Sequence, residues 1–145
     1  MPPKTLSLYA LTLLALTTGC DLFGPAPSLS HAAATNGCGP ADGPTWIILL
    51  ASDPIRSATP PTPYVSVEIW QPVIPVLVQA YAIGSGASAS YSPWPGTVQR
   101  ASDGSVALTK VDSAGIEGTV DLQFPAKTVK TAFSGPWIRS SSLCN

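Results

Sequence analysis

The chain has 145 residues, of which only 10% are charged, and its formal net charge is −1. The lysines and arginines are scattered along the chain, which argues against nucleic-acid binding because that function needs a basic patch. The single histidine argues against most histidine-dependent catalysis and metal binding. With 45% hydrophobic residues, the chain can form one modest globular domain.

The N-terminal segment has the three-part pattern of an export signal. A positive start, from the α-amino group and Lys4, precedes an uncharged apolar segment over residues 6–16. A membrane-spanning helix requires roughly 20 apolar residues, and this shorter segment is typical of a signal peptide. A buried core helix is the alternative, but the proline- and alanine-rich sequence that follows disfavours it. We therefore predict a signal helix within residues 1–19.

The apolar segment ends at Thr18-Gly19-Cys20, two small residues followed by a cysteine. This ending resembles the lipobox of bacterial lipoproteins, and the resemblance is confined to the N-terminal segment. It implies that residues 1–19 are removed and that Cys20 is acylated. The lipid bilayer is then one partner of the protein, which sits outside the cytoplasm on an inner or outer membrane of the cell envelope. Cleavage by an ordinary signal peptidase, at the small residues Thr17 and Gly19, is the alternative.

Residues 20–37 are small, polar and dotted with proline, a composition that predicts a flexible spacer. His31 lies within this segment, and we interpret it as a spacer residue rather than a catalytic base. The spacer follows the acylated cysteine, so it would separate the folded part from the membrane. We place that folded domain at residues 38–145.

The chain has three cysteines, an odd number. If Cys20 carries lipid, Cys38 and Cys144 remain at the two ends of the folded part, and an exported protein is expected to join such a pair in a disulfide. A bond that closes a loop of this length stabilises a domain by about 4–5 kcal/mol in the chain-entropy model. Metal ligation is the alternative, but two distant cysteines without neighbouring histidines or cysteines make a poor zinc site.

Two segments in the first half of the domain have β-strand patterns. Residues 45–51 form a continuous apolar run that is typical of a buried strand. Residues 64–70 alternate apolar side chains with polar and aromatic ones, which predicts a strand with one buried face. We expect another strand to begin near Val76, and residues 84–96 to form either a long loop or a weak strand.

The second half predicts three strands, at residues 105–111, 116–124 and 129–134, with turn sequences at 112–115 and 125–127. Tight turns between consecutive strands make an antiparallel meander. No amphipathic helical pattern competes with the strands outside the signal. We therefore predict an all-β fold, a single small antiparallel β-sandwich or barrel.

The end of this domain resembles that of many small uncharacterised bacterial lipoproteins. The motifs that carry the resemblance are Gly104-Ser-Val-Ala-Leu, Gly118-Thr-Val-Asp-Leu-Gln-Phe and Ala132-Phe-Ser-Gly-Pro-Trp, followed by a terminal cysteine. The resemblance is loose and implies no activity.

The sequence contains no recognisable catalytic set. A hydrolase needs a nucleophile, a base and an orienting group, and the only histidine lies in the spacer. A carboxylate pair for glycoside cleavage could come from Glu68, Glu117 and Asp121, but each falls on the polar phase of a strand, where solvated charge is ordinary. We expect no enzyme activity, no cofactor and no metal site, with a glycan hydrolase using Glu68 or Glu117 as an alternative.

Four aromatic residues are the candidates for ligand binding. Tyr64 and Trp70 share the polar phase of one predicted strand, whereas Tyr91 and Trp94 lie in the segment rich in glycine, serine and proline. Exposed rings that lie near one another can bind sugar rings or a peptide. The alternative is that a two-layer sandwich buries these rings in its core.

Together these observations predict a lipid-anchored protein of the bacterial cell envelope. We expect it to act without catalysis, through binding or assembly, with an envelope protein or a glycan as its partner. A carbohydrate- or peptide-binding module that uses the exposed aromatic residues is the alternative function. Rings that converge on one exposed face favour this alternative.

Overall fold

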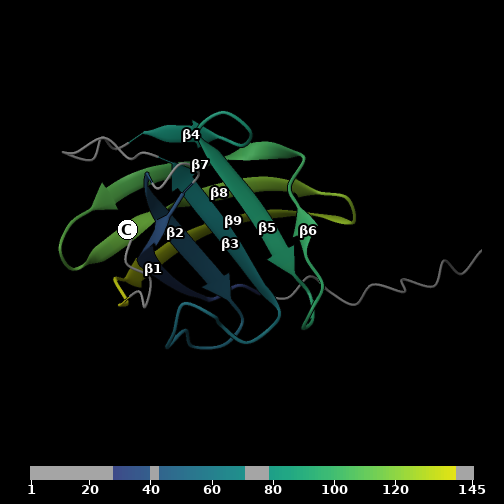
Figure 1. Cartoon of the computed structure of the whole chain (residues 1–145), viewed down its shortest axis with the longest axis horizontal. Coiled ribbons are helices and arrows are strands. Elements are labelled where there is room, and N and C mark those ends of the chain that lie inside the picture. Colours follow the sequence, from purple (N-terminus) through teal and green to yellow (C-terminus); the bar gives the residue numbers. More distant parts are fainter. Residues whose placement is uncertain (1–27, 40–42, 71–78, 140–145) are drawn as a thin grey trace, which may run out of the picture.

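The computed structural model describes residues 28–39, 43–70 and 79–139, and these residues confirm the all-β prediction. They form two antiparallel sheets that pack against each other as a small β-sandwich (Figure 1). The strands are β1 (His31–Cys38), β2 (Pro44–Ala51), β3 (Tyr64–Trp70), β4 (Ala80–Ala82), β5 (Ala87–Ser92), β6 (Gln99–Arg100), β7 (Asp103–Val111), β8 (Gly115–Phe124) and β9 (Lys127–Pro136). The predicted signal segment, Cys20 and Cys144 lie outside the described residues.

The first sheet has five strands in the order β1-β2-β3-β5-β6. Strand β3 has the predicted bounds, and Val65, Val67 and Ile69 are fully buried while the residues between them are partly exposed. Successive strand residues point to opposite faces, so every second side chain of β3 reaches the core. The apolar run of β2 is likewise the buried strand that its sequence predicts.

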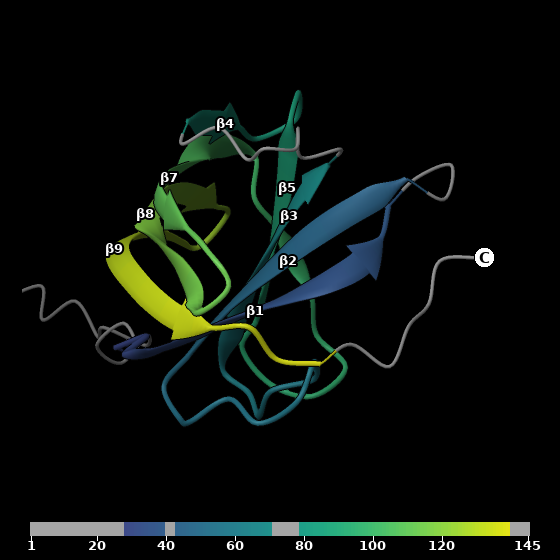
Figure 2. The same ribbon diagram turned by 90° about the vertical axis from the view of Figure 1, so that its left-hand side faces the viewer.

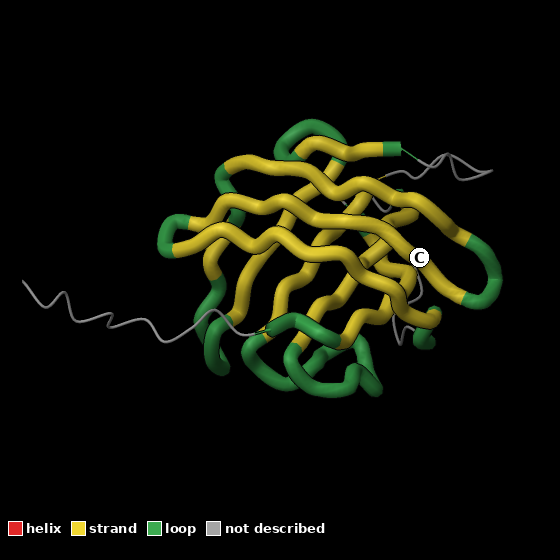
Figure 3. The backbone as a smooth tube through the Cα atoms, turned by 180° about the vertical axis from the view of Figure 1, so that it is seen from behind, coloured by secondary structure: helices red, strands yellow, loops and turns green. Residues whose placement is uncertain are grey.

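The second sheet has four strands in the order β4-β7-β8-β9, and its last three form the predicted meander. Strand β8 buries Ile116, Val120, Leu122 and Phe124, and it leaves the polar residues between them outside. From behind, the strands of this sheet cross steeply over those of the first sheet (Figure 3). The apolar phases of both sheets meet in one core between the two layers.

The two sheets meet where β1 passes β9 (Figure 2). Gly135 of β9 lies against the backbone of Ala32, where any side chain would collide. Just after β9, Trp137 forms a parallel β-bridge with Ala34 of β1. The backbone N–H of Ile138 donates to the carbonyl of Ala34 at 2.8 Å, and Trp137 packs edge-to-face on Trp46 with ring centroids 5.5 Å apart. This corner therefore closes one side of the sandwich.

The sandwich begins earlier in the chain than we predicted. The segment expected to end as a flexible spacer at residue 37 instead contains strand β1, which pairs with β2 along its whole length. Ala33, Ala34 and Thr35 are almost completely buried there. Alanine has a low intrinsic strand preference, but its small side chain fits beside a large apolar strand, so tertiary packing overrides the local signal. His31 is the first residue of this strand.

The glycine-rich segment 84–96 contains a true strand, β5, rather than only a loop. Its serines and alanines pair with β3 in a regular antiparallel ladder. The strand expected from Val76 onward is described only as the short β4, because residues 71–78 lie outside the described part.

Candidate functional site

The outer face of the five-stranded sheet faces the viewer in Figure 1. Where this face is formed by β3 and β5, it carries aromatic, hydroxyl and charged side chains. On β3 and β5 the outward positions are occupied by Tyr64, Ser66, Glu68, Trp70, Ser88, Ser90 and Ser92. The ladder sets Tyr64, Ser66 and Glu68 of β3 each beside a serine of β5, because antiparallel neighbours on one face lie directly opposite each other.

Strands β3, β5 and β6 line a hollow of about 440 Å³, which we call the serine groove. The groove is lined by Ser66, Glu68, Trp70, Ile83, Gly84, Ser88, Ala89, Ser90, Val98, Arg100 and Ala101. The hydroxyl of Ser88 donates a hydrogen bond to Oε2 of Glu68 at 3.3 Å. The exposed Arg100 is the cross-strand neighbour of Ser90 and forms no ion pair with any carboxylate of the described residues. A carboxylate, a guanidinium and several hydroxyls therefore share one groove.

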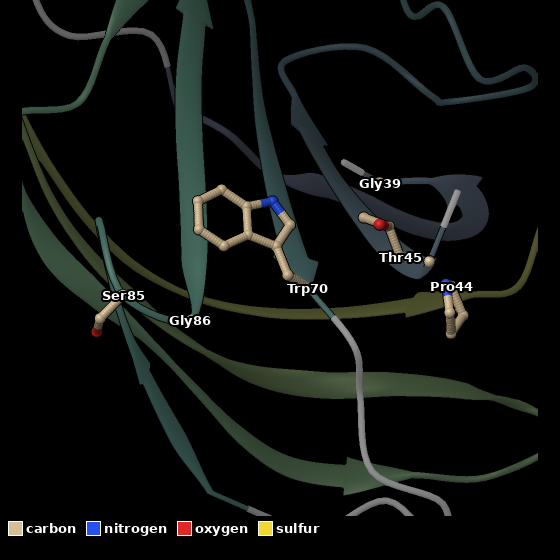
Figure 4. Close-up of a pocket in the computed structure, with 7 residues that line it drawn as sticks. Gly39, Pro44, Thr45, Trp70, Ser85 and Gly86 are labelled. Carbon is tan, nitrogen blue, oxygen red and sulfur yellow. The ribbon is translucent and has the colours of Figure 1, made fainter. Parts of the chain in front are cut away.

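Trp70 also lines a second hollow of about 260 Å³, which we call the glycine pocket. Figure 4 shows this pocket, which Trp70 shares with Gly39, Gly43, Pro44, Thr45, Ser85 and Gly86. Thr45 and Trp70 are cross-strand neighbours, and the indole nitrogen lies on the side of the ring toward Thr45 (Figure 4).

Two polar atoms of residues that line the glycine pocket are shielded from solvent and form no hydrogen bond with each other. Oγ1 of Thr45 and Nε1 of Trp70 have no hydrogen-bond partner within the part of the chain that the structure describes. A buried polar group without a partner costs about 1–3 kcal/mol, which makes both atoms ready to bond a polar group that enters the pocket. A side chain at Gly39 would collide with the Thr45 hydroxyl, so this position has room only for glycine.

A third hollow, of about 520 Å³, lies at the opposite end of β3, and we call it the proline groove. The groove is lined by Thr59, Pro60, Pro61, Thr62, Tyr64, Ser92, Trp94, Pro95, Gly96, Thr97 and Val98. Trp94 is 60% exposed there, which is unusual for so large an apolar side chain. Gly96 adopts a φ of 79°, a conformation that glycine tolerates best, in the turn that carries Trp94.

The structure therefore separates the four predicted aromatic residues. Tyr64 and Trp94 converge on the proline groove, and Trp70 lies at the other end of the same outer face. Tyr91 is different. It belongs to the inward phase of β5, packs against Phe124 with ring centroids 5.8 Å apart, and has the Lys127 ammonium 3.4 Å from its ring centre. Tyr91 is a core residue, and we withdraw it from the binding set.

The candidate carboxylates do not form a pair. Glu68 lies on the outer face of the first sheet, whereas Glu117 and Asp121 lie on that of the second. Asp121 accepts a hydrogen bond from Lys130 at 2.7 Å, and Glu117 accepts one from Lys110 at 3.4 Å. These contacts are those of an ordinary charged surface, in which such ion pairs contribute little.

Cys38 ends β1 at the exposed rim of the first sheet. Its predicted partner Cys144 lies outside the described residues, so the pairing stays a prediction. Within residues 28–39, 43–70 and 79–139, no cluster of three or more histidine, cysteine or acidic side chains is suited to hold a metal ion. The same part of the chain contains no helix with the length and hydropathy of a membrane span.

Comparison with protein-family models, with curated proteins and with solved structures found no match. The geometry of the outer face is therefore the basis for any functional conclusion about the described domain.

Sequence reasoning missed Thr45, Arg100 and the serines of β5 as site residues. Period-two alternation predicts that Trp70 faces outward, but it does not say which strand lies beside β3. Strand β5 is recognisable only weakly from its alternating serine and alanine. The pairing of Thr45 with Trp70 could have been found by aligning the two strongest strands in antiparallel register.

Proposed function

We propose that this protein is a lipid-anchored component of the bacterial cell envelope that binds a partner without catalysis. The anchor is acylated Cys20, after removal of residues 1–19, and the β-sandwich is the binding domain outside the cytoplasm. The anchor is supported by the sequence alone, through the apolar segment and the Thr18-Gly19-Cys20 ending.

One observation carries the binding role. Tyr64 and Trp94, which are 30 positions apart in the chain, line the same exposed groove, and Trp70 lies on the same outer face. Large rings on a rimmed, hollowed surface are typical of ligand or partner sites. Tyr64 and Trp94 therefore meet the condition that favours binding over core packing, whereas Trp70 shares their face but lies at its other end.

A disulfide between Cys38 and Cys144 completes this proposal. Its support is the direction of the chain after β9. Trp137 and Ile138 run parallel to β1 beside Ala34, and β1 ends four residues later at Cys38. At Ile138 the chain is thus heading toward the end of β1 where Cys38 lies, which is the direction that a bond to Cys144 requires.

Metabolic labelling with a radioactive fatty acid tests the anchor. The wild-type chain is expected to incorporate label and to fractionate with membranes, and Cys20→Ser is expected to lose both properties. Cys38→Ser is the matched control, because it removes a cysteine outside the lipobox and is expected to keep the label. Equal labelling of the wild type and Cys20→Ser would contradict lipidation.

A second experiment tests the binding surface. A photo-crosslinking amino acid at Trp94 is expected to yield adducts in intact cells, and the same amino acid at Thr119, on the outer face of the other sheet, is expected to yield none. Equal adducts at both positions would contradict a binding role for the aromatic face.

A further inference from the structure

The serine groove has the chemistry of a site for a hydroxyl-rich ligand. Serine hydroxyls can donate and accept hydrogen bonds, the Glu68 carboxylate accepts them, and the Arg100 guanidinium donates them. All these groups line one groove. Three of its lining residues, Ser66, Ser88 and Ser90, have short side chains that leave room for a ligand. Hydrogen bonds to the charged groups are the strongest of this set, and they fix the orientation of a ligand.

Trp70 adds an apolar surface at the end of the groove. Sugar rings present C–H groups on their faces and hydroxyls around their edges, so they pack on an indole while hydrogen-bonding to neighbouring polar groups. Trp70 is partly exposed, and it separates the serine groove from the glycine pocket. In the glycine pocket, Thr45 is only 3% exposed, and its hydroxyl has no hydrogen-bond partner among the described residues.

The other classes of ligand fit less well. A peptide that adds a strand needs an open sheet edge of some length. The backbone of β3 and β5 under the serine groove is already paired, and the edge strand β6 has only two residues. A nucleic acid needs several cations, and Arg100 is accompanied by a carboxylate in the same groove. A lipid needs an apolar lining throughout, whereas five of the eleven residues that line this groove carry a hydroxyl or a charge.

The face is long enough for more than one sugar. Strand β3 extends from Tyr64 at the proline groove to Trp70, a length of about 20 Å at the usual strand rise. Val98 lines both the serine groove and the proline groove, so the two hollows adjoin. A chain of sugar rings could therefore contact Trp70 at one end and Trp94 at the other.

We infer that the outer face of the five-stranded sheet binds an oligosaccharide, with a pyranose ring packed on Trp70 and its hydroxyls bonded to Glu68 and the β5 serines. This inference rests on the proposed binding function, whose ligand class it names. Glu68 acts as a hydrogen-bond acceptor here, and no bond of the glycan is broken.

Calorimetric titration of the full chain carrying Cys20→Ser tests this assignment with cellohexaose, chitohexaose, maltohexaose and a polyproline peptide as probes. At least one of the three glycans is expected to bind. Trp70→Ala is expected to weaken that binding at least about tenfold, as loss of a central aromatic contact does. Glu68→Gln keeps the side-chain shape and is expected to weaken it by about tenfold through loss of a charge-assisted hydrogen bond.

Glu117→Gln is the matched control, because it makes the same chemical change on the other sheet and is expected to leave glycan binding unchanged. If Trp70→Ala fails to fold by circular dichroism, Glu68→Gln decides the question. Binding of no glycan, or glycan binding that survives Glu68→Gln unchanged, would overturn the inference. Peptide binding that depends on Trp70, without glycan binding, would overturn the ligand class and leave the binding function intact. Recovery of a cleaved glycan would contradict the non-catalytic function and leave glycan recognition standing.

Discussion

On the outer face of the four-stranded sheet, the cations lie beside carboxylates, with Lys130 2.7 Å from Asp121 and Lys110 3.3 and 3.4 Å from Asp112 and Glu117. On the outer face of the five-stranded sheet, Arg100 has no such partner among the described residues and shares its groove with a tryptophan and three serines. Strand β3 of one sheet and strand β8 of the other share the same alternation of inward apolar positions with outward polar or aromatic ones. The difference indicates that one face satisfies its own charges, whereas the other holds polar and aromatic groups available to a ligand.

The largest expected effect concerns the proposed disulfide, which would join Cys38, at the end of β1 in the five-stranded sheet, to Cys144. The Cys38→Ser/Cys144→Ser double variant is expected to lower the free energy of unfolding by about 4–5 kcal/mol, because a bond that closes a loop of this length restricts the unfolded chain. Chemical unfolding followed by circular dichroism measures the loss. The intact mass of the wild type is expected to rise by the mass of two hydrogen atoms on reduction, and no change in mass would contradict the disulfide.

The next prediction compares a core residue with an outward-facing residue of the same strand. Ile48 of β2 is fully buried between the sheets, whereas its neighbour Ile47 points outward and is partly exposed. Ile48→Ala is expected to cost about 2–5 kcal/mol of unfolding free energy through a cavity, and Ile47→Ala is expected to cost clearly less. Urea unfolding of the two variants measures the difference, and equal losses would show that the outer face is as tightly packed as the core.

A smaller effect is expected at the corner where the sheets meet. Gly135→Ala places a methyl group against the backbone of Ala32 and is expected to cost about 1–3 kcal/mol, because β1 and β9 must move apart. Ala132→Gly, at an exposed position of the same strand, controls for the general effect of glycine and alanine in β9. A thermal midpoint for Gly135→Ala equal to that of the wild type would contradict the close approach of the two strands.

The smallest effect concerns acid pH on the charged face. The backbone N–H groups of Ala114 and Gly115 hold the pKa of Asp112 below its ordinary value, and Lys110 lowers it further. A carboxyl whose pKa is lowered by folding stabilises the fold above its unfolded pKa, and this contribution disappears as the pH falls through the folded pKa. Asp112→Asn is therefore expected to lower the thermal midpoint at neutral pH and to match the wild type in strong acid. A difference that stays constant across this pH range would contradict the role of the charge.

Much of the architecture was predictable, because local patterns determine it. The alternation of residues 64–70 predicts the bounds and the buried face of β3, and the turns at 112–115 and 125–127 predict the meander. Strand β1 was not predictable in this way. Its alanines carry a weak strand signal, and only the apolar surface of β2 beside them makes the strand stable.

The candidate site shows the same division. The outward position of Trp70 follows from the alternation in its own strand. Its placement between Thr45 of β2 and Gly86, just before β5, follows from the pairing of the strands. The sequence of residues 84–96 is compatible with a long loop or a weak strand, and only the pairing of β5 with β3 shows that Tyr91 turns into the core against Phe124.

The sequence by itself determined the all-β class and the three-strand meander, since each depends on side chains close together in the chain. It is also the sole basis of the export signal that we propose. Only the tertiary structure decided which strands are neighbours, and therefore which side chains share a groove. The pairing of strands that are distant in the sequence depends on how the apolar faces of the two sheets pack around a common core, and no local sequence pattern predicts that packing. The aromatic and hydroxyl face of the five-stranded sheet is the result of that pairing.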